Sequence, residues 1–229
     1  MKVIGLIGGI SWVSTLEYYK LINEGINAKL GDLNAAHCII YSFNFQDIKR
    51  NNDSNNWDLT LKMVTDASMH LQNSGAKAIV LCANTMHLIA NELQHKIDIP
   101  VIHIASATAA EVKKYNLKKV GLLGTKFTME RDFFSDRLAQ QSIDVIIPED
   151  DDRAFIHYTI FEELGRNIVL RQTKDRYIRI VNKLISKGAE GVILGCTEIP
   201  LLIQPEDASV PVFDTTKIHA AAAVDFSLG

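Results

Sequence analysis

The sequence predicts an α/β protein made of two similar domains, each a mostly parallel sheet flanked by helices. Apolar runs of about four to eight residues, bounded by glycine, are typical of strands buried on both faces of a parallel sheet. Longer segments with apolar residues at helical spacing separate these runs, so strand and helix patterns alternate along the chain. The same succession occurs twice in the 229 residues, which indicates a duplicated unit.

Three strand-like segments in the first half have counterparts in the second half, in the same order and at nearly the same spacing. The pairs are Ile4–Gly9 with Val120–Thr125, Gly75–Cys82 with Gly188–Cys196, and Ile99–His103 with Val210–Asp214. We therefore expect a first domain at residues 1–105 and a second at residues 106–209. The final residues, 210–229, contain a helical pattern and are expected to pack back on the first domain.

The helix that follows the first strand is expected to begin at Ser14, because Glu17 three residues later completes a capping box. Its packed side is predicted from three apolar residues at helical spacing: Leu16, Tyr19 and Ile22. A helix in the second half has similar spacing and ends where Gly188 follows it. The apolar residues of that helix are Ile178, Val181, Leu184 and Ile185.

Composition and charge argue against several classes of protein. The chain carries 24 basic and 27 acidic side chains, a formal net charge of −3, so we expect no nucleic-acid partner. Its hydrophobic content of 47% is that of an ordinary globular protein, and its apolar runs are shorter than the roughly 18 residues that cross a bilayer. The apolar run after Lys2 lacks a signal-peptide cleavage site. Three cysteines without an export signal favour free thiols, and the cytoplasm as location.

The chemistry is expected at the carboxyl ends of the strands, where parallel α/β sheets bind ligands. Cys82 and Cys196 each close an apolar strand and precede a polar segment. A thiol beside a helix N-terminus has a lowered pKa, so both residues are candidate bases. Their similar places in the two repeats suit removal of a proton from one face of a carbon and its return on the other. The alternative is that each cysteine only fills the core, as free cysteines often do.

Other motifs point to no cofactor. The Gly5–Gly9 segment lacks the order of a dinucleotide-binding fingerprint, and Gly124–Lys126 is not a phosphate-binding loop. Three histidines have no partners at metal-ligand spacing: His87, His95 and His103. Ser11 follows two glycines at a strand end, where it could hold a carboxylate or only cap a helix.

Six short motifs form a specific combination that extends over essentially the whole chain. They are Gly8-Gly9-Ile10-Ser11-Trp12, Asn84-Thr85-Met86-His87, Leu122-Leu123-Gly124-Thr125, Phe161-Glu162-Glu163-Leu164, Gly195-Cys196-Thr197-Glu198-Ile199 and Val212-Phe213-Asp214-Thr215-Thr216. Together they resemble the aspartate/glutamate racemase family, most closely its bacterial L-aspartate/glutamate-specific and broad-specificity amino-acid racemases. The resemblance implies two Rossmann-like domains with the active site in the cleft between them, a homodimer, and no pyridoxal phosphate or metal. It also implies a reaction in which each domain supplies one of two bases.

Carried over position by position, the resemblance assigns Cys196 as the catalytic residue of the second domain. The family's first catalytic residue stands immediately before Asn-Thr, a position that Ala83 occupies here, with Cys82 one residue earlier. Successive side chains of an extended strand point to opposite faces. Either a local turn therefore brings Cys82 to the substrate, or Cys196 works with water or another group.

The resemblance also implies the residues that contact the substrate. They are Ile10, Ser11, Asn52, Ala83, Asn84, Thr85 and Thr197, with Arg166 as the nearest basic residue for a distal carboxylate. The function that follows is a cofactor-independent amino-acid racemase for aspartate, glutamate or a broader set, acting by cysteine-based proton abstraction and return at Cα. Two alternatives stay open: a decarboxylase or isomerase of the same superfamily, and a catalytically impaired amino-acid-binding protein.

Overall fold

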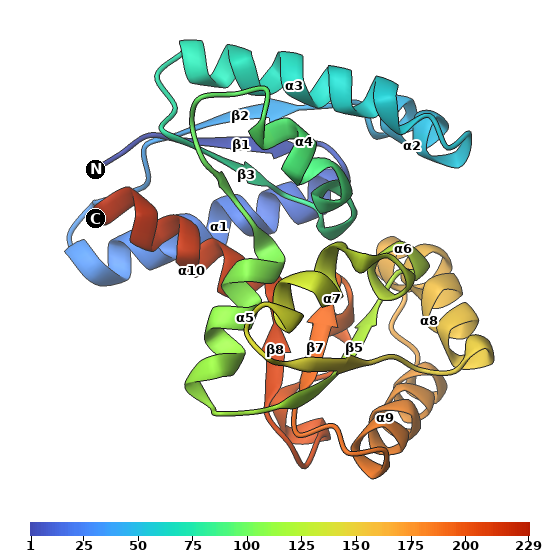
Figure 1. Ribbon diagram of the computed structural model, residues 1–229. Coiled ribbons are helices and arrows are strands. Elements are labelled where there is room, and N and C mark those ends of the chain that lie inside the picture. The colour runs from blue at the N-terminus through green and yellow to red at the C-terminus, as the bar shows by residue number, and fades with distance from the viewer. The chain divides into compact units, whose positions relative to one another are not determined.

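The computed structural model describes residues 1–229 as two compact units (Figure 1). The first unit combines Met1–His103 with the C-terminal residues His219–Gly229, and the second is the continuous stretch Ile104–Ile218. Each unit contains one four-stranded sheet whose neighbouring strands all run parallel. The predicted α/β class, with two similar parallel-sheet domains, is confirmed.

The sheet of the first unit has the strand order β2-β1-β3-β4. Its strands are β1 (Ile4–Gly8), β2 (Cys38–Ser42), β3 (Ala78–Leu81) and β4 (Val101–Ile102). β1 and β3 lie in the centre of the sheet, and every residue of both strands is buried. Their continuous apolar sequences are explained by this burial, because helices cover both faces of the sheet.

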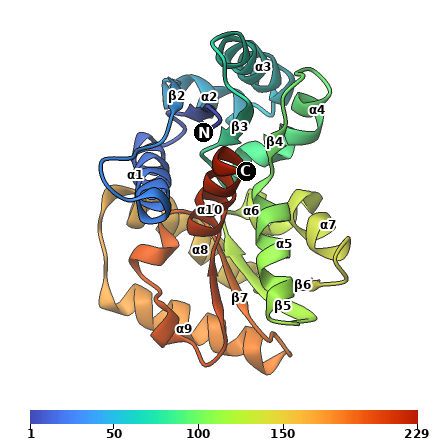
Figure 2. The same cartoon turned by 90° about the vertical axis from the view of Figure 1, so that its left-hand side faces the viewer.

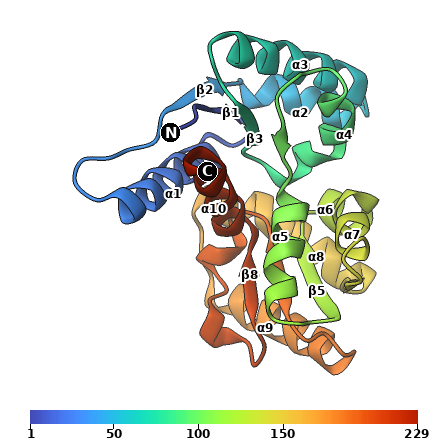
Figure 3. The ribbon, with the colours of Figure 1, turned by 60° about the vertical axis from the view of Figure 1, so that its left-hand side comes forward.

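The helices of the first unit form two layers around this sheet. They are α1 (Trp12–Leu30), α2 (Phe45–Asp53), α3 (Trp57–Asn73), the 3-10 helix η1 (Asn84–Ile89), α4 (Ala90–Gln94) and the C-terminal part of α10 (Thr215–Leu228). α1 and α10 lie side by side on one face, where they pack on Val80 of β3 (Figures 2 and 3). α3 and α4 cover the other face and pack on Ile79 and Leu81. Consecutive residues of β3 thus serve two separate cores.

Helix α1 begins three residues earlier than the sequence predicts. Its N-cap is Ser11, whose hydroxyl accepts a hydrogen bond from the Ser14 backbone N–H at 3.4 Å, and Ser14 is buried in the first turn. The predicted packed side is right for Ile22 but wrong for Leu16 and Tyr19, which are 57% and 45% exposed. The side that packs against the sheet and α10 follows a four-residue spacing instead: Tyr18, Ile22 and Ile26.

The sheet of the second unit has the strand order β6-β5-β7-β8. Its strands are β5 (Lys119–Gly124), β6 (Asp144–Ile146), β7 (Val192–Gly195) and β8 (Val212–Asp214). The central strands β5 and β7 are buried, apart from the partly buried first residue of β5. This arrangement repeats that of the first unit.

Helices also cover both faces of the second sheet. They are α5 (Ile104–Lys114), α6 (Lys126–Glu130), α7 (Asp132–Ala139), α8 (Asp150–Glu162) and α9 (Arg171–Ser186), with the 3-10 helices η2 (Leu164–Arg166), η3 (Ile199–Leu201) and η4 (Pro205–Asp207). α5 and α7 share a core with Leu122 and Ile193, whereas α8 and α9 share one with Leu123 and Leu194. Gly188 follows α9 with a φ of +95°, as predicted, because a side chain is strained in this left-handed conformation.

The predicted duplication is visible in the sheets. β1 corresponds to β5, β3 to β7 and β4 to β8, which are the three strand pairs expected from the sequence. The C-terminal segment divides differently from the expectation, because β8 pairs with β7 through Val212 and Val192. Residues up to Ile218 therefore stay with the second unit, and only His219–Gly229 pack on the first.

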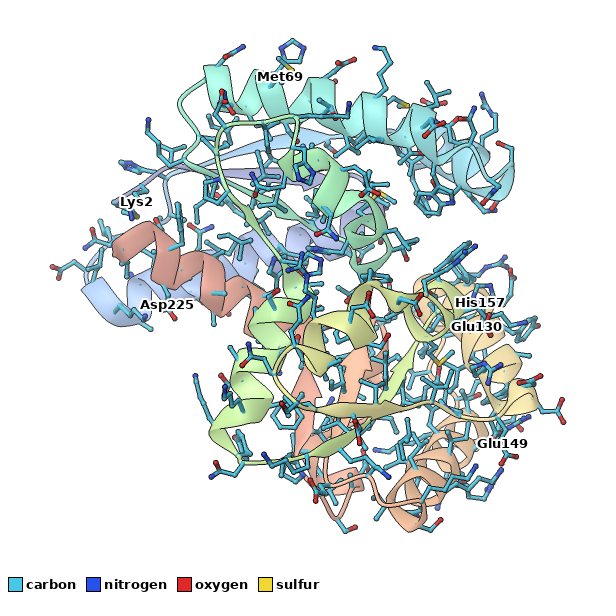
Figure 4. All side chains as sticks on the ribbon, viewed as in Figure 1. Lys2, Met69, Glu130, Glu149, His157 and Asp225 are labelled. Carbon is cyan, nitrogen blue, oxygen red and sulfur yellow. The ribbon has the colours of Figure 1, made fainter.

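Charged side chains form ion pairs on the surface of each unit. Asp225 of α10 pairs with Lys29 of α1 in the first unit, and Glu149 pairs with Lys187 at 2.6 Å in the second; Figure 4 labels both acids. Such exposed pairs contribute little to stability, because water and salt screen their charges. No helix of the chain combines the length and the apolar character needed to cross a membrane.

Candidate functional site

The carboxyl edge of the second sheet places Thr125 next to Cys196. Thr125 follows β5 and Cys196 follows β7, and these neighbouring strands pair in register through Gly124 and Gly195. The Thr125 hydroxyl caps α6 by accepting a hydrogen bond from the Thr128 backbone N–H at 3.3 Å. Because parallel α/β sheets bind ligands at this edge, Thr125 and Cys196 mark the candidate site in the second unit.

Cys196 lies in direct contact with a carboxylate. Its thiol donates a hydrogen bond to Oε2 of Glu198, with sulfur and oxygen 2.8 Å apart. The Thr197 hydroxyl donates to the same oxygen, also over 2.8 Å. All three residues are partly exposed. One carboxylate oxygen thus accepts from two proton donors at an edge that solvent reaches.

The resting site holds Cys196 as a thiol. Burial raises the pKa of this group well above its ordinary value, and the charge and hydrogen bond of Glu198 raise it further. The backbone N–H groups of Thr197 and Glu198 act in the opposite direction, because they stabilise the thiolate. The expected lowering of the Cys196 pKa by a helix N-terminus is wrong. The helix η3 that follows has only three residues, and its dipole does not outweigh burial and a carboxylate.

Strand register shows that Ala83, rather than Cys82, is the counterpart of Cys196. Ile7 of β1 and Leu123 of β5 occupy matching positions in the two units. Ile7 is paired with Leu81 of β3, and Leu123 is paired with Leu194 of β7. Ala83 stands two residues after Leu81, and Cys196 stands two residues after Leu194. The sequence comparison paired Cys82 with Cys196 one residue out of register, so the carboxyl edge of the first sheet has no equivalent thiol.

Cys82 lies in the core of the first unit. It is 1% exposed, packs between the sheet and the helices α1 and α10, and directs its thiol toward the Val80 carbonyl at 3.8 Å. Burial raises the pKa of this thiol far above its ordinary value. Ala83 is extended, with φ −152° and ψ 131°, and packs in the opposite core with α3 and α4. No local turn brings Cys82 to the edge, so its predicted role as a base does not agree with its position.

The loop after β1 has a strained backbone at the carboxyl edge of the first sheet. Gly9 has a φ of +77° and Ser11 a φ of +61°, both in the left-handed region. Thr15 braces the loop, because its hydroxyl accepts from the Gly9 N–H at 2.9 Å and donates to the Ser11 carbonyl at 3.1 Å. Ile10 is 7% exposed and packs in the core. The Ser11 hydroxyl caps α1, which is the second of the two roles that the sequence allows.

Asn84 and Thr85 begin η1 directly after Ala83, as the sequence places them. Asn84 is 8% exposed and Thr85 is partly exposed. Further along η1, the His87 ring lies 4.7 Å from the ring of His103 and 5.2 Å from that of His219, measured between centroids. Three imidazoles therefore pack edge to face next to the turn that carries Asn84 and Thr85.

His219 is neutral and fully engaged. Its Nε2–H donates to the Ile102 carbonyl at 2.7 Å, and its Nδ1 accepts from the Tyr18 hydroxyl at 2.8 Å. Burial lowers the pKa of His219 to about 4, which the hydrogen bond to Ile102 only partly opposes. No sequence pattern indicates these hydrogen bonds, because Tyr18, Ile102 and His219 lie far apart along the chain.

Two predicted substrate contacts are engaged in other interactions. Asn52 lies in α2, where its Oδ1 accepts from the Thr60 hydroxyl of α3 at 3.0 Å. The Arg166 side chain is 62% exposed and pairs with Glu162 at 2.6 Å. A different basic residue, Lys126, follows β5. Its backbone N–H donates a hydrogen bond to the half-buried imidazole of His157 on α8, which Figure 4 labels.

Glu198 contacts Cys196 but was not among the site residues that the sequence predicted. The sequence could have indicated this contact, because a chain that turns immediately after a strand can bring residues two apart, such as Cys196 and Glu198, into contact. No group of three or more histidine, cysteine, aspartate or glutamate side chains is arranged to hold a metal ion. A cavity of about 810 Å³ lies at the start of α8 and along α9, and none of the predicted site residues lines it. Its central carboxylate, Asp152, is already paired with Arg176 and Lys183.

Fold and site together define a class of protein with two duplicated α/β units. At the carboxyl edge of the second sheet, a cysteine is hydrogen-bonded to a carboxylate. A family model described as Asp/Glu/Hydantoin racemase matches residues 7–223. The chain belongs to this family. The resemblance stated from the sequence motifs is confirmed.

Known proteins of this kind are similar over the full length. A solved structure from Yersinia pestis, assigned to the Asp/Glu racemases, is 44% identical, covers 100% of both chains and has a TM-score of 0.96. An aspartate racemase homologue from Pyrococcus horikoshii is 37% identical with the same coverage and a TM-score of 0.89. The broad-specificity amino-acid racemase RacX of Bacillus subtilis is 22% identical over 235 residues, which is 97% of this chain and 96% of its own.

Proposed function

We propose that the protein is an amino-acid racemase in which Cys196 removes the Cα proton of the substrate from one face, and a proton from Thr85 or water is added to the opposite face. The observation that carries the proposal is the 2.8 Å contact between the Cys196 thiol and Glu198. A thiol with an adjacent proton acceptor is an arrangement that acid–base catalysis uses. Family membership supports the reaction class. The proposed thiol chemistry needs neither pyridoxal phosphate nor a metal ion.

The proposed reaction begins with the hydrogen bond between Cys196 and Glu198. Transfer of the thiol proton to Glu198 leaves a thiolate, which the backbone N–H groups of Thr197 and Glu198 stabilise. The thiolate takes the proton from Cα, and the electron pair stays on the substrate, delocalised into its α-carboxylate. Preorganised donors must stabilise that charge, and we assign this task to Thr197, Asn84 and Thr85.

The remaining proposed substrate contacts are those that the family resemblance implies. They are Ile10, Ser11, Asn52 and Ala83. Arg166 is left out of the proposal because its charge is compensated by Glu162 at an exposed position. Lys126 is exposed and begins α6 just beyond β5, so a distal carboxylate has a mobile cation there rather than a fixed clamp. This supports a substrate range that includes aspartate and glutamate but is not confined to them.

The experiment that tests the proposed function follows the Cα hydrogen of each L-amino acid in deuterium oxide. Proton NMR measures loss of the Cα signal, and chiral chromatography measures the D-isomer. We expect at least one amino acid to react, and Cys196→Ala to reduce its rate by at least about 100-fold, because the proton carrier is removed.

Cys38→Ala is the matched control. Cys38 is a half-buried thiol at the start of β2, at the amino edge of the first sheet, so we expect its removal to leave the rate unchanged. Loss of activity in both variants, or activity that survives in Cys196→Ala, would contradict the assignment. No reaction with any of the amino acids would overturn the proposed function.

A second candidate function, amino-acid binding without turnover, is favoured by Ala83. This residue occupies the position equivalent to Cys196 and has no proton to give. Calorimetry would then show binding of an amino acid while the deuterium experiment shows no exchange. Exchange of the Cα hydrogen faster than the uncatalysed rate would show that the protein is an enzyme and not only a binding protein.

We also propose that the protein works as a homodimer. Helix α1 supports this, because it exposes an apolar stripe in which Trp12, Leu16 and Tyr19 are 70%, 57% and 45% exposed. Contiguous exposed apolar side chains commonly mark protein interfaces. Sedimentation equilibrium distinguishes a dimer from the 25.5 kDa monomer.

A further inference from the structure

We propose that this protein exchanges the Cα hydrogen of one enantiomer of its substrate with solvent, with retention of configuration, faster than it inverts that carbon. The inference rests on the proposed function and adds a second measurable activity to it. It comes from two observations: one carboxyl edge carries a thiol and the other does not, and the thiol that is present is linked to a partly exposed carboxylate.

The first step concerns the number of thiols at the carboxyl edges. Cys196 stands at the edge of the second sheet, and its register counterpart in the first sheet is Ala83. Cys82 is 1% exposed in the core, and Cys38 begins β2, which places it at the opposite edge. Cys196 is therefore the one thiol of the chain that can act as a proton carrier at a carboxyl edge.

The second step concerns other groups that could replace the missing thiol. At the edge of the first sheet, the Ser11 hydroxyl is engaged in capping α1, and His87 is 1% exposed. Thr85 is partly exposed, but its hydroxyl releases a proton far less readily than a thiol. A second proton from Thr85 or from water makes inversion possible, at a lower rate than return of a proton by Cys196.

The third step is the route by which Cys196 exchanges its proton with solvent. When the Cα–H bond breaks, the proton forms an S–H bond with the thiolate and the electron pair stays on the substrate. Glu198, which took the original thiol proton, first releases that proton to water, because its carboxyl group is partly exposed, and the thiol then passes the Cα-derived proton to Glu198 over the 2.8 Å contact. In deuterium oxide a deuteron returns by the same route, and a Cα–D bond forms on the face from which the proton left.

The test uses the full-length protein in deuterium oxide with each enantiomer of the reactive amino acid supplied separately. Loss of the Cα–H signal and formation of the opposite enantiomer are measured in the same early samples. For one enantiomer we expect exchange to be at least about tenfold faster than inversion. If the unreacted enantiomer keeps its hydrogen while every product molecule carries deuterium, the inference is overturned.

Ala83→Cys gives a gain-of-function test. Its extended backbone accommodates any side chain, and the variant places a thiol at the counterpart of Cys196. We expect inversion to rise toward the rate of exchange, whereas Cys38→Ala should leave the ratio unchanged. Ala83→Ser is a smaller change that we expect to give an intermediate ratio, which guards against misfolding of the cysteine variant.

The outcomes separate this inference from the proposed function. Inversion as fast as exchange in the wild-type protein refutes the inference and leaves the racemase assignment intact. Absence of both exchange and inversion refutes the proposed function itself.

Discussion

Glu198 shares a single carboxylate oxygen between the Cys196 thiol and the Thr197 hydroxyl. This arrangement has opposing effects on the thiol. The negative charge raises the pKa of Cys196 and so disfavours the thiolate, yet the same oxygen provides the acceptor that receives the thiol proton. In the proposed reaction, reactivity at this residue therefore depends on proton transfer within a pair, not on a thiolate that exists in the resting protein.

The variant Glu198→Gln separates these two effects, because it keeps the size of the side chain and removes the charge. We expect kcat for Cα exchange to fall by about 100-fold, since an amide cannot accept the proton. Without this acceptor the variant needs a thiolate that exists before the substrate reacts, and burial keeps the Cys196 pKa high, so the acid limb of the kcat/KM profile should move to higher pH. Rates measured between about pH 5 and 10 check both effects.

Glu198→Asp is the conservative control for that profile. It keeps the charge, so we expect the acid limb to stay near its original position while part of the rate is lost through the shorter reach. A fall in rate for Glu198→Gln without any movement of the limb would show that the residue only supports the local structure.

At the scale of single residues, the sequence placed the right residue, Cys196, at the carboxyl edge of the second sheet, but the wrong one, Cys82, at the carboxyl edge of the first. Cys196 was identifiable because it follows an uninterrupted apolar strand and precedes polar residues. Cys82 was assigned to the same role because it also closes such a strand. An apolar strand that is buried on both faces has no alternation to fix which face a residue points to. The sequence therefore left Cys82 and Ala83 as alternatives, and strand register identifies Ala83 as the counterpart of Cys196.

Among the secondary-structure elements, α1 begins at a backbone conformation that rarely suits a side chain. Ser11 has a φ of +61°, and its hydroxyl accepts the N-cap hydrogen bond from Ser14. Backbone strain at Ser11 therefore offsets part of the stability that the cap provides. Two serines, Ser11 and Ser14, stand at the start of this helix, and the sequence favoured Ser14 as the N-cap because Glu17 follows it at the right spacing. The choice of Ser11 is made by the Thr15 hydroxyl, which bonds to both Gly9 and Ser11.

Substitution of Ser11 distinguishes the strain from the cap. Ser11→Ala loses the capping oxygen and keeps the strain of a Cβ in the left-handed region, whereas Ser11→Gly loses the cap but relieves the strain. We expect the free energy of unfolding to be lower for the alanine variant than for the glycine variant by about 1 kcal/mol. Urea denaturation followed by circular dichroism measures the difference, and equal losses in the two variants would contradict it.

At the scale of the whole molecule, the duplication was predictable because it rests on apolar strands in a fixed order. The membership of the C-terminal segment was not predictable, because it depends on which edge strand β8 joins. β8 pairs with β7, and the chain then leaves the second unit within α10 to complete the first. His219 is the first residue of that return, and it bonds to α1 and β4.

The His219 contacts predict a pH-dependent loss of stability. Burial lowers its pKa to about 4 in the folded protein, from an ordinary value of 6.5 that the unfolded chain keeps. Between these values the unfolded state binds more protons, so the free energy of unfolding falls as the pH drops below 6.5. The contribution approaches about 3 kcal/mol near pH 4.

Replacement of the titrating group tests this origin. His219→Gln cannot gain a proton, so we expect its stability to decline less steeply than that of the wild-type protein between pH 7 and about pH 4. Urea unfolding at several pH values gives the two slopes. Parallel slopes for the two proteins would show that the acid sensitivity arises elsewhere, for example from the Asp152 carboxylate, whose pKa its ion pairs with Lys183 and Arg176 lower despite burial.

The return of the C-terminal residues to the first unit affects the order in which the chain can fold during synthesis. A ribosome releases Met1–His103 early, but the layer formed by His219–Gly229 is still untranslated at that moment. Ile104–Ile218 emerge as one uninterrupted stretch and can close their own core before translation ends. The unit that is made first is therefore the one that is finished last, and its α1 face stays uncovered until His219–Gly229 emerge.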